Sequence, residues 1–114
     1  QASRAANPAL RIVLLDPFVL PVQSPRPGVK NLETYAPQRE EVDKRRAVVA
    51  MLAKEFDAVH IKTQDIFDVA AEQVSAERLL WDAIHPLPMG HELIARHWLQ
   101  QVSARWPKNV TENK

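Results

Sequence analysis

Two short apolar runs, separated by a helical pattern, constrain the fold of this chain more than any other feature. Residues 10–15 read Leu-Arg-Ile-Val-Leu-Leu, and residues 58–61 read Ala-Val-His-Ile. A nearly continuous apolar run of this kind, rather than strict alternation, is typical of a strand that is covered on both faces. Because the segment between the runs is long enough for a right-handed helical crossover, the two strands are predicted to pair in parallel.

Helices are predicted between and after these strands. Residues 37–56 carry apolar side chains at helical spacing with charges between them, and shorter helices are expected over 65–71 and 75–80. The last helix is predicted over 89–105, with one apolar stripe made of Ile94, Ala95, Trp98, Leu99 and Val102. The predicted fold class is therefore α/β, with two strands and three to four helices.

A sheet of two apolar strands would leave both of its edges unpaired, which is a poor arrangement for a stable protein. The two strands are therefore predicted to belong to a larger sheet whose other strands are not in this chain. Within the 114 residues we expect one domain over 9–106, after a lead-in loop over 1–8 and before a flexible tail over 107–114.

The composition excludes several classes of function. Fifteen basic and fourteen acidic residues give a net charge of +1, which is too balanced to indicate a nucleic acid or an anionic membrane as a partner. No apolar stretch approaches the roughly 20 residues that a membrane span needs. The chain has no cysteine, which excludes a disulfide framework and a thiolate zinc site.

The segment Asp82-Ala83-Ile84-His85-Pro86 is the part of the chain that indicates chemistry. An imidazole acts as a general base near neutral pH when another group sets its tautomer and stabilises the imidazolium. A carboxylate three residues upstream on an irregular turn can reach Nδ1 and leave Nε2 facing a nucleophile. The alternative is that Asp82 only accepts backbone N–H groups at the start of a helix.

The other candidate residues give weaker evidence for a functional site. His91 and His97 are six residues apart and lie on different faces of one helix, so we expect neither a metal nor another cofactor, and His60 is expected to be a packed strand residue. None of the serines stands in a glycine-rich turn that would expose a nucleophile. Trp81 either walls a substrate pocket or covers the core. Phe18 follows the first strand, where ligands bind in open α/β sheets.

These residues resemble a known family. The run from Trp81 to Pro86, followed by Gly90-His91, the Ile94-Ala95 pair and the later Trp98-Leu99, resembles the last conserved block of the SGNH (GDSL) hydrolases. The segment Asp16-Pro17-Phe18-Val19-Leu20-Pro21 and the helix around 39–53 are also similar to that family, most of all to its acetyl-xylan esterase branch. The resemblance covers roughly residues 9–106.

The resemblance implies the C-terminal half of a three-layer α/β/α sandwich on a parallel sheet of about five strands. It implies a serine esterase acting on small acyl esters, with acetylated carbohydrate as the candidate substrate, His85 as base and Asp82 as its orienting group. The Gly-Asp-Ser nucleophile block and the oxyanion blocks of the family are absent, and Ala83 stands where glycine is common. The expected partner is a missing N-terminal half or another copy of the chain; the alternative is a non-catalytic module that pairs through its open sheet edge.

Overall fold

The computed structural model describes residues 2–22 and 35–107. Within these residues the elements are two strands and five helices, whereas two strands and three to four helices were predicted from the sequence. In chain order they are α1 (Ala2–Ala6), β1 (Val13–Leu15), α2 (Tyr35–Glu55), β2 (Val59–Ile61), α3 (Thr63–Ala70), α4 (Ala76–Leu79) and α5 (Pro88–Arg105).

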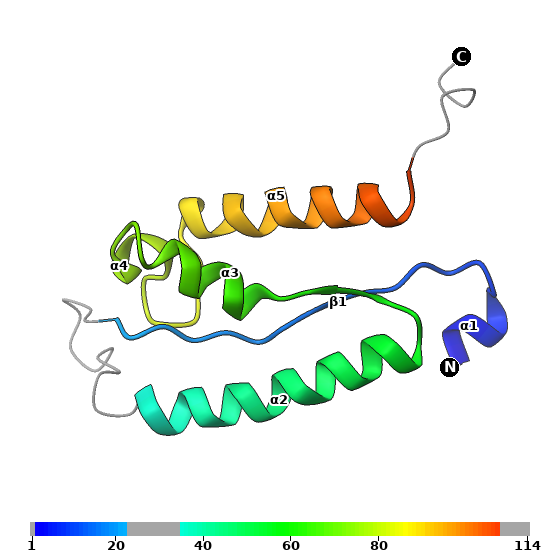
Figure 1. Ribbon diagram of the computed structural model, residues 1–114, viewed down its shortest axis with the longest axis horizontal. Helices are drawn as coiled ribbons and strands as arrows, with labels where there is room; N and C mark the ends of the chain where they lie inside the picture. The colour runs from blue at the N-terminus through cyan, green and yellow to red at the C-terminus, as the bar shows by residue number, and fades with distance from the viewer. Residues whose placement is uncertain (1, 23–34, 108–114) are drawn as a thin grey trace, which may run out of the picture.

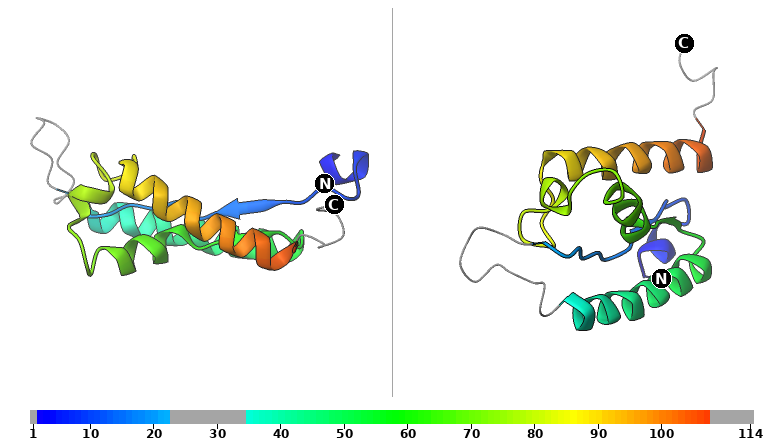
Figure 2. Two further views of the ribbon diagram at one scale, coloured as in Figure 1. Left: turned by 90° about the horizontal axis from the view of Figure 1, so that it is seen from above. Right: turned by 60° about the vertical axis from the view of Figure 1, so that its left-hand side comes forward.

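The two strands form a parallel pair between two layers of helices. Val13 pairs with Val59 and Leu15 with Ile61, and Figure 1 shows α2 on one side of the strands and α5 on the other. The right-hand view of Figure 2 also shows the strands between these two helices. The predicted α/β class with a parallel strand pair and a helical crossover is therefore confirmed.

The strands are shorter than the apolar runs that predicted them. Strand β1 begins at Val13, and the carbonyl of the preceding Ile12 accepts the backbone N–H of Val59 at 2.9 Å. Further upstream the chain turns, and the backbone N–H of Leu10 donates to the Asn7 carbonyl at 3.0 Å. At the other end the backbone N–H of Asp16 donates to the carbonyl of Ile61 at 3.0 Å, which holds the chain beside β2 for one more residue. Both strands are therefore three residues long.

The structure differs from the expected lead-in loop at the N-terminus. Residues 2–6 form the short helix α1, and the guanidinium of Arg4 donates to the carbonyl oxygens of Phe56 and Asp57. These contacts attach the segment to the turn between α2 and β2, a tertiary effect that local composition does not reveal. The expected tail beyond Pro107 and most of the loop between β1 and α2 lie outside the described residues.

The last helix presents a different face to the core from the predicted apolar stripe. Ile94 and Val102 are partly buried, but Trp98 and Leu99 are 39% and 59% exposed. Gly90 determines this rotation, because a Cβ built on it would meet the Leu79 carbonyl oxygen at 2.5 Å. The absence of a side chain at Gly90 allows this close approach, and it places the side of α5 that carries Gly90 against its neighbours.

The hydrophobic core lies beside the segment that follows β1. Its buried members come from residues 19–22, from α3 and α4, and from the loop before α5: Val19, Leu20, Val22, Phe67, Leu79, Leu80 and Ala83. The core therefore joins the end of β1 to the loop that carries Asp82 and His85. Among the described helices, none combines the length and the apolar character needed to cross a membrane.

Candidate active site

The loop between α4 and α5 is closed into a narrow turn by backbone hydrogen bonds. Leu80 and Pro86 form an isolated antiparallel bridge, and the backbone N–H of Trp81 donates to the carbonyl of His85 at 3.1 Å. The backbone N–H of Leu87 donates to the Leu79 carbonyl at 2.8 Å, immediately before α5 begins. Residues 82–85 therefore form the tip of a short, closed loop.

Asp82 uses its two carboxylate oxygens differently. Oδ1 accepts the backbone N–H groups of Ile84, at 3.1 Å, and of His85, at 2.7 Å. Oδ2 faces Nδ1 of the His85 ring in a very short hydrogen bond. Both interpretations of the sequence thus describe the same carboxylate, since Asp82 shapes the turn and also holds the imidazole.

The His85 ring is exposed while its partner is not. The His85 side chain is 62% exposed, whereas the Asp82 side chain is 13% exposed. Nε2 of His85 makes no hydrogen bond or ion pair with any residue within 2–22 and 35–107. Because Nδ1 is occupied by the carboxylate, Nε2 is the ring nitrogen that remains accessible to a reacting group.

Hydrogen bonding controls the charge of Asp82. Partial burial raises the pKa of this carboxyl group, but the hydrogen bonds from the His85 side chain and from the backbone N–H groups of His85 and Ile84 lower it by more. The net result is a pKa below the usual aspartate value, because these bonds favour the ionised form. Asp82 is therefore a carboxylate at neutral pH and can stabilise an imidazolium at position 85.

The two predicted substrate-binding residues are placed differently. Trp81 stacks on the His85 ring, with centroids 5.7 Å apart and planes inclined by 22°, and is 39% exposed. Phe18 packs instead against Phe67 at a centroid distance of 4.7 Å and borders the core. The structure brings Trp81 and the candidate dyad together, and it places the Phe18 ring against a core residue.

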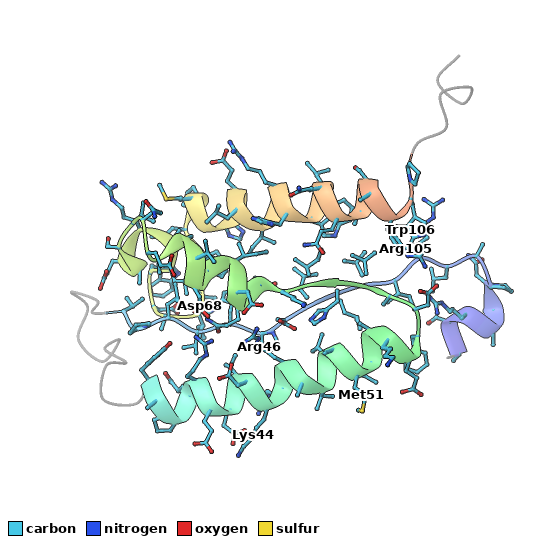
Figure 3. All side chains as sticks on the ribbon, in the orientation of Figure 1. Lys44, Arg46, Met51, Asp68, Arg105 and Trp106 are labelled. Carbon is cyan, nitrogen blue, oxygen red and sulfur yellow. The ribbon has the colours of Figure 1, made fainter. Side chains whose placement is uncertain are left out.

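A second polar cluster joins β1, α2 and β2, and no local pattern in the sequence predicted it. The buried Asp16 carboxylate accepts Nε2–H of His60 at 2.5 Å and Nε–H of Arg46 at 3.2 Å. Figure 3 shows Arg46 on the side of α2 that faces the strands, opposite Lys44 and Met51. Arg46 also binds Asp43 and Asp65, and the cluster lines a hollow of about 350 Å³.

His60 is therefore a hydrogen-bond partner of Asp16 rather than a merely packed strand residue. The only signal in the sequence was a lone aspartate at the end of an apolar run, which does not specify its partner 44 residues away. Burial lowers the pKa of Arg46, but its hydrogen bonds to Asp43 and Asp16 raise it above its usual value. Among the described residues, no group of three or more histidine or acidic side chains is arranged to hold a metal ion.

The site has a base and an orienting carboxylate, but the described part of the chain brings no nucleophile to them. Ser3 lies in α1, Ser75 lies just before α4, and Ser103 lies near the end of α5. None of them belongs to the loop that carries Asp82 and His85. The His85 imidazole can accept a proton at Nε2, and the Asp82 carboxylate can stabilise the resulting positive charge. These two groups correspond to two of the three members of a hydrolytic triad.

Comparison with proteins of known sequence relates this chain to esterases. No protein-family model matches it. An acetylxylan esterase from Geobacillus stearothermophilus is 29% identical over 73 residues, which are 64% of this chain and 33% of that protein. The chain therefore spans about a third of the length of this relative.

Solved structures have the same fold. A GDSL-like lipase from Parabacteroides merdae matches with a TM-score of 0.74 and 24% identity, over 90% of this chain and 44% of its own. A variant of the Geobacillus stearothermophilus acetylxylan esterase matches with a TM-score of 0.66 and 26% identity, over 86% of this chain and 41% of its own.

Together, these matches show that the chain has the α/β fold of a GDSL-like lipase and is similar to an acetylxylan esterase, so the resemblance predicted from the sequence is confirmed. The acetylxylan esterase is similar to this chain in both sequence and fold. Three of the matched structures are described as catalytic mutants of that esterase, in which a serine, a histidine or an aspartate is replaced by alanine.

Proposed function

We propose that this chain is the C-terminal half of an SGNH serine esterase, in which His85 is the general base and Asp82 its orienting carboxylate. The observation that carries the proposal is the contact between Asp82 Oδ2 and His85 Nδ1, with Nε2 left accessible. In the matched acetylxylan esterase the replaced aspartate and histidine are three positions apart, as Asp82 and His85 are. A tryptophan directly before that aspartate is replaced in another of its structures, in the place that Trp81 occupies here.

The reaction follows from the roles of these groups. A serine hydroxyl, supplied from outside this chain, attacks the ester carbonyl while Nε2 of His85 takes its proton. The imidazolium, stabilised by the Asp82 carboxylate, then returns the proton to the leaving alcohol, and an acyl-enzyme forms. Water, activated by the same imidazole, releases the acid. The proposed substrates are small acyl esters, in the first place acetyl esters of a carbohydrate.

The isolated chain is expected to show no more than trace turnover, because the nucleophile and the oxyanion donors are supplied from elsewhere. Triads that lose one member fall by several orders of magnitude. We therefore expect the purified 114-residue chain to leave p-nitrophenyl acetate essentially unhydrolysed. Robust hydrolysis that is abolished by His85→Ala would contradict the fragment proposal.

A chimera tests the roles of the two residues. Residues 9–106 would replace the matching segment of the Geobacillus stearothermophilus esterase, which retains its own serine. We expect esterase activity that falls by at least about 10³-fold with His85→Ala and strongly with Asp82→Ala. His91→Ala, on an exposed side chain of α5, is the matched control and should keep the activity. A folded chimera that is active without His85 would refute the assignment.

The alternative is a non-catalytic module that pairs with another chain. Within the described residues, β1 bonds to β2 alone, and Leu15 at its end is 40% exposed. An unpaired apolar strand edge recruits further strands. Native mass spectrometry that shows only monomer at micromolar concentration would count against this alternative.

A further inference from the structure

Gln64 is a fully buried polar residue in the first turn of α3, and its side chain pairs with the backbone of another segment. Its Oε1 atom accepts the backbone N–H of Val19 at 2.8 Å, and its Nε2 atom donates to the Val19 carbonyl at 3.0 Å. Val19 lies beyond the end of β1, where no strand of the described residues bonds to its backbone. The Gln64 amide therefore replaces a neighbouring strand at this residue.

The orientation of this amide is set by an ion pair behind it. Nε2 of Gln64 also donates to Oδ1 of Asp68 at 2.9 Å, and the Asp68 carboxylate accepts two hydrogen bonds from Arg39, at 2.9 and 2.8 Å. A carboxylate can only accept, so a reversed amide would place two oxygen atoms against each other. The Arg39–Asp68 pair thus holds the amide in the one orientation that fits both backbone groups of Val19.

The segment held by Gln64 is bonded directly to the candidate active-site loop. The backbone N–H of Leu20, the residue after Val19, donates to the carbonyl of Ala83 at 3.2 Å. Ala83 is 2% exposed, has a positive φ of 85° and follows Asp82 in the chain. A displacement of Val19 would move the N–H group that holds the Ala83 carbonyl, and with it the turn that sets the Asp82–His85 contact.

We propose that Gln64 is a positioning residue, which fixes the location of the Asp82–His85 pair through Val19, Leu20 and Ala83. The importance of Gln64 for catalysis rests on the proposed function, whereas its hydrogen-bonded connection to Ala83 does not. A small displacement of a general base lowers the reaction rate by a large factor. The buried Gln64 amide, whose hydrogen-bonding groups are all bonded, therefore affects the rate through the position of His85 as well as the stability of the fold. A purely structural Gln64 would lower stability and leave the geometry of His85 unchanged.

The test compares Gln64→Met with Thr63→Val in the 114-residue chain. Methionine is similar in length and lacks amide hydrogen bonds, whereas Thr63 is equally buried and its hydroxyl bonds only to the nearby Ile61 carbonyl, at 3.3 Å. The readout is the ¹H and ¹⁵N spectrum of the histidine rings, including the hydrogen-bonded Nδ1 proton of His85. The rings of His91 and His97 serve as internal references.

We expect Gln64→Met to shift or broaden the Nδ1 proton signal of His85 while the reference rings stay in place. Thr63→Val should leave all three rings unchanged, even where it lowers stability. A folded Gln64→Met variant with an unaltered His85 signal would overturn the proposal. Because this readout needs no turnover, it remains informative if the chimera shows no esterase activity.

A second measurement needs no variant, in case Gln64→Met does not fold. In the wild-type chain, the side-chain amide protons of Gln64 and the backbone N–H groups of Val19 and Leu20 should be protected from hydrogen exchange to a similar degree. They should lose protection together as urea is added, since they open as one unit. Exchange of the Leu20 N–H at the unprotected rate, with the Gln64 amide still protected, would also overturn the proposal.

Discussion

Gly90 packs against the carbonyl oxygen of Leu79 so closely that position 90 has no room for a side chain. A Cβ would lie 2.5 Å from that oxygen, 3.1 Å from Pro86 Cβ and 3.3 Å from a ring carbon of Phe67. Two of these neighbours are backbone or proline atoms that cannot rotate away. The contact fixes how α5 sits against the loop that presents His85.

Gly90→Ala is expected to destabilise the protein by about 1–3 kcal/mol, the usual cost of overpacking. At an exposed helix position the same substitution would have the opposite effect, because alanine there stabilises a helix by roughly 1 kcal/mol relative to glycine. Urea unfolding followed by circular dichroism measures the difference. Ser103→Ala, on the exposed side of α5, is the control and should be neutral or slightly stabilising. A Gly90→Ala variant more stable than the wild type would contradict the packing described above.

Ala83 is expected to tolerate glycine and to reject a β-branched residue. Its φ of 85° lies in the left-handed region, which costs an L-residue roughly 1–2 kcal/mol. Glycine removes this strain but loses a buried methyl group and adds chain entropy, so Ala83→Gly should change stability by less than about 1 kcal/mol. Ala83→Val should cost more than about 2 kcal/mol. Thermal unfolding of both variants checks the order, and equal effects would refute it.

Asp82 should make stability depend on pH on the acid side. Its pKa is lower in the folded protein than the ordinary value of 3.8, so its contribution is fully present above that pH. The contribution is lost as the pH falls through the depressed folded value, because the unfolded chain then binds more protons. Asp82→Asn should flatten the acid limb of the curve of unfolding free energy against pH.

Asp43, whose pKa is also lowered, offers a comparison for this measurement. Partial burial raises its pKa, but hydrogen bonds from Arg46 and Arg39 lower it by more. Asp43→Asn should flatten the same limb while leaving the ring signals of His85 unchanged. The two effects should add, because the sites share no partner. An Asp82→Asn acid limb with the same slope as that of the wild type would show that the His85 contact does not stabilise the fold.

Asp16 is expected to be among the residues least tolerant of substitution. Its side chain is 1% exposed and bonds to both Arg46 and His60. Removing one partner of a buried ion pair costs several kcal/mol, and because Arg46 keeps Asp43 and Asp65 we expect about 2–3 kcal/mol for Asp16→Ala. Glu92→Ala, which removes an exposed pair with Arg96 on α5, is the control and should cost less than about 1 kcal/mol. Equal losses in urea unfolding would contradict the assigned burial.

Local patterns were enough to predict the candidate dyad and most of the elements. Asp82 and His85 are three residues apart, so a turn that closes on itself brings the carboxylate to Nδ1 without help from distant segments. The helix over 37–56 and the parallel strands were likewise predicted from periodicity and apolar runs, since both signals are carried by neighbouring residues. The roles of Asp82 and His85 in catalysis stay predictions that the chimera can test.

Contacts between residues far apart in the chain could not be predicted in this way. Asp16 and His60 are 44 residues apart, and Val19 and Gln64 are 45 apart. Each pair can form only when the crossover helix has brought the two strands together. The rotation of α5 depends equally on the Leu79 carbonyl that Gly90 meets. The local residue pattern determines which helices, strands and turns are favourable. The distant partners are determined by packing, because only the folded chain brings particular polar groups together in the interior.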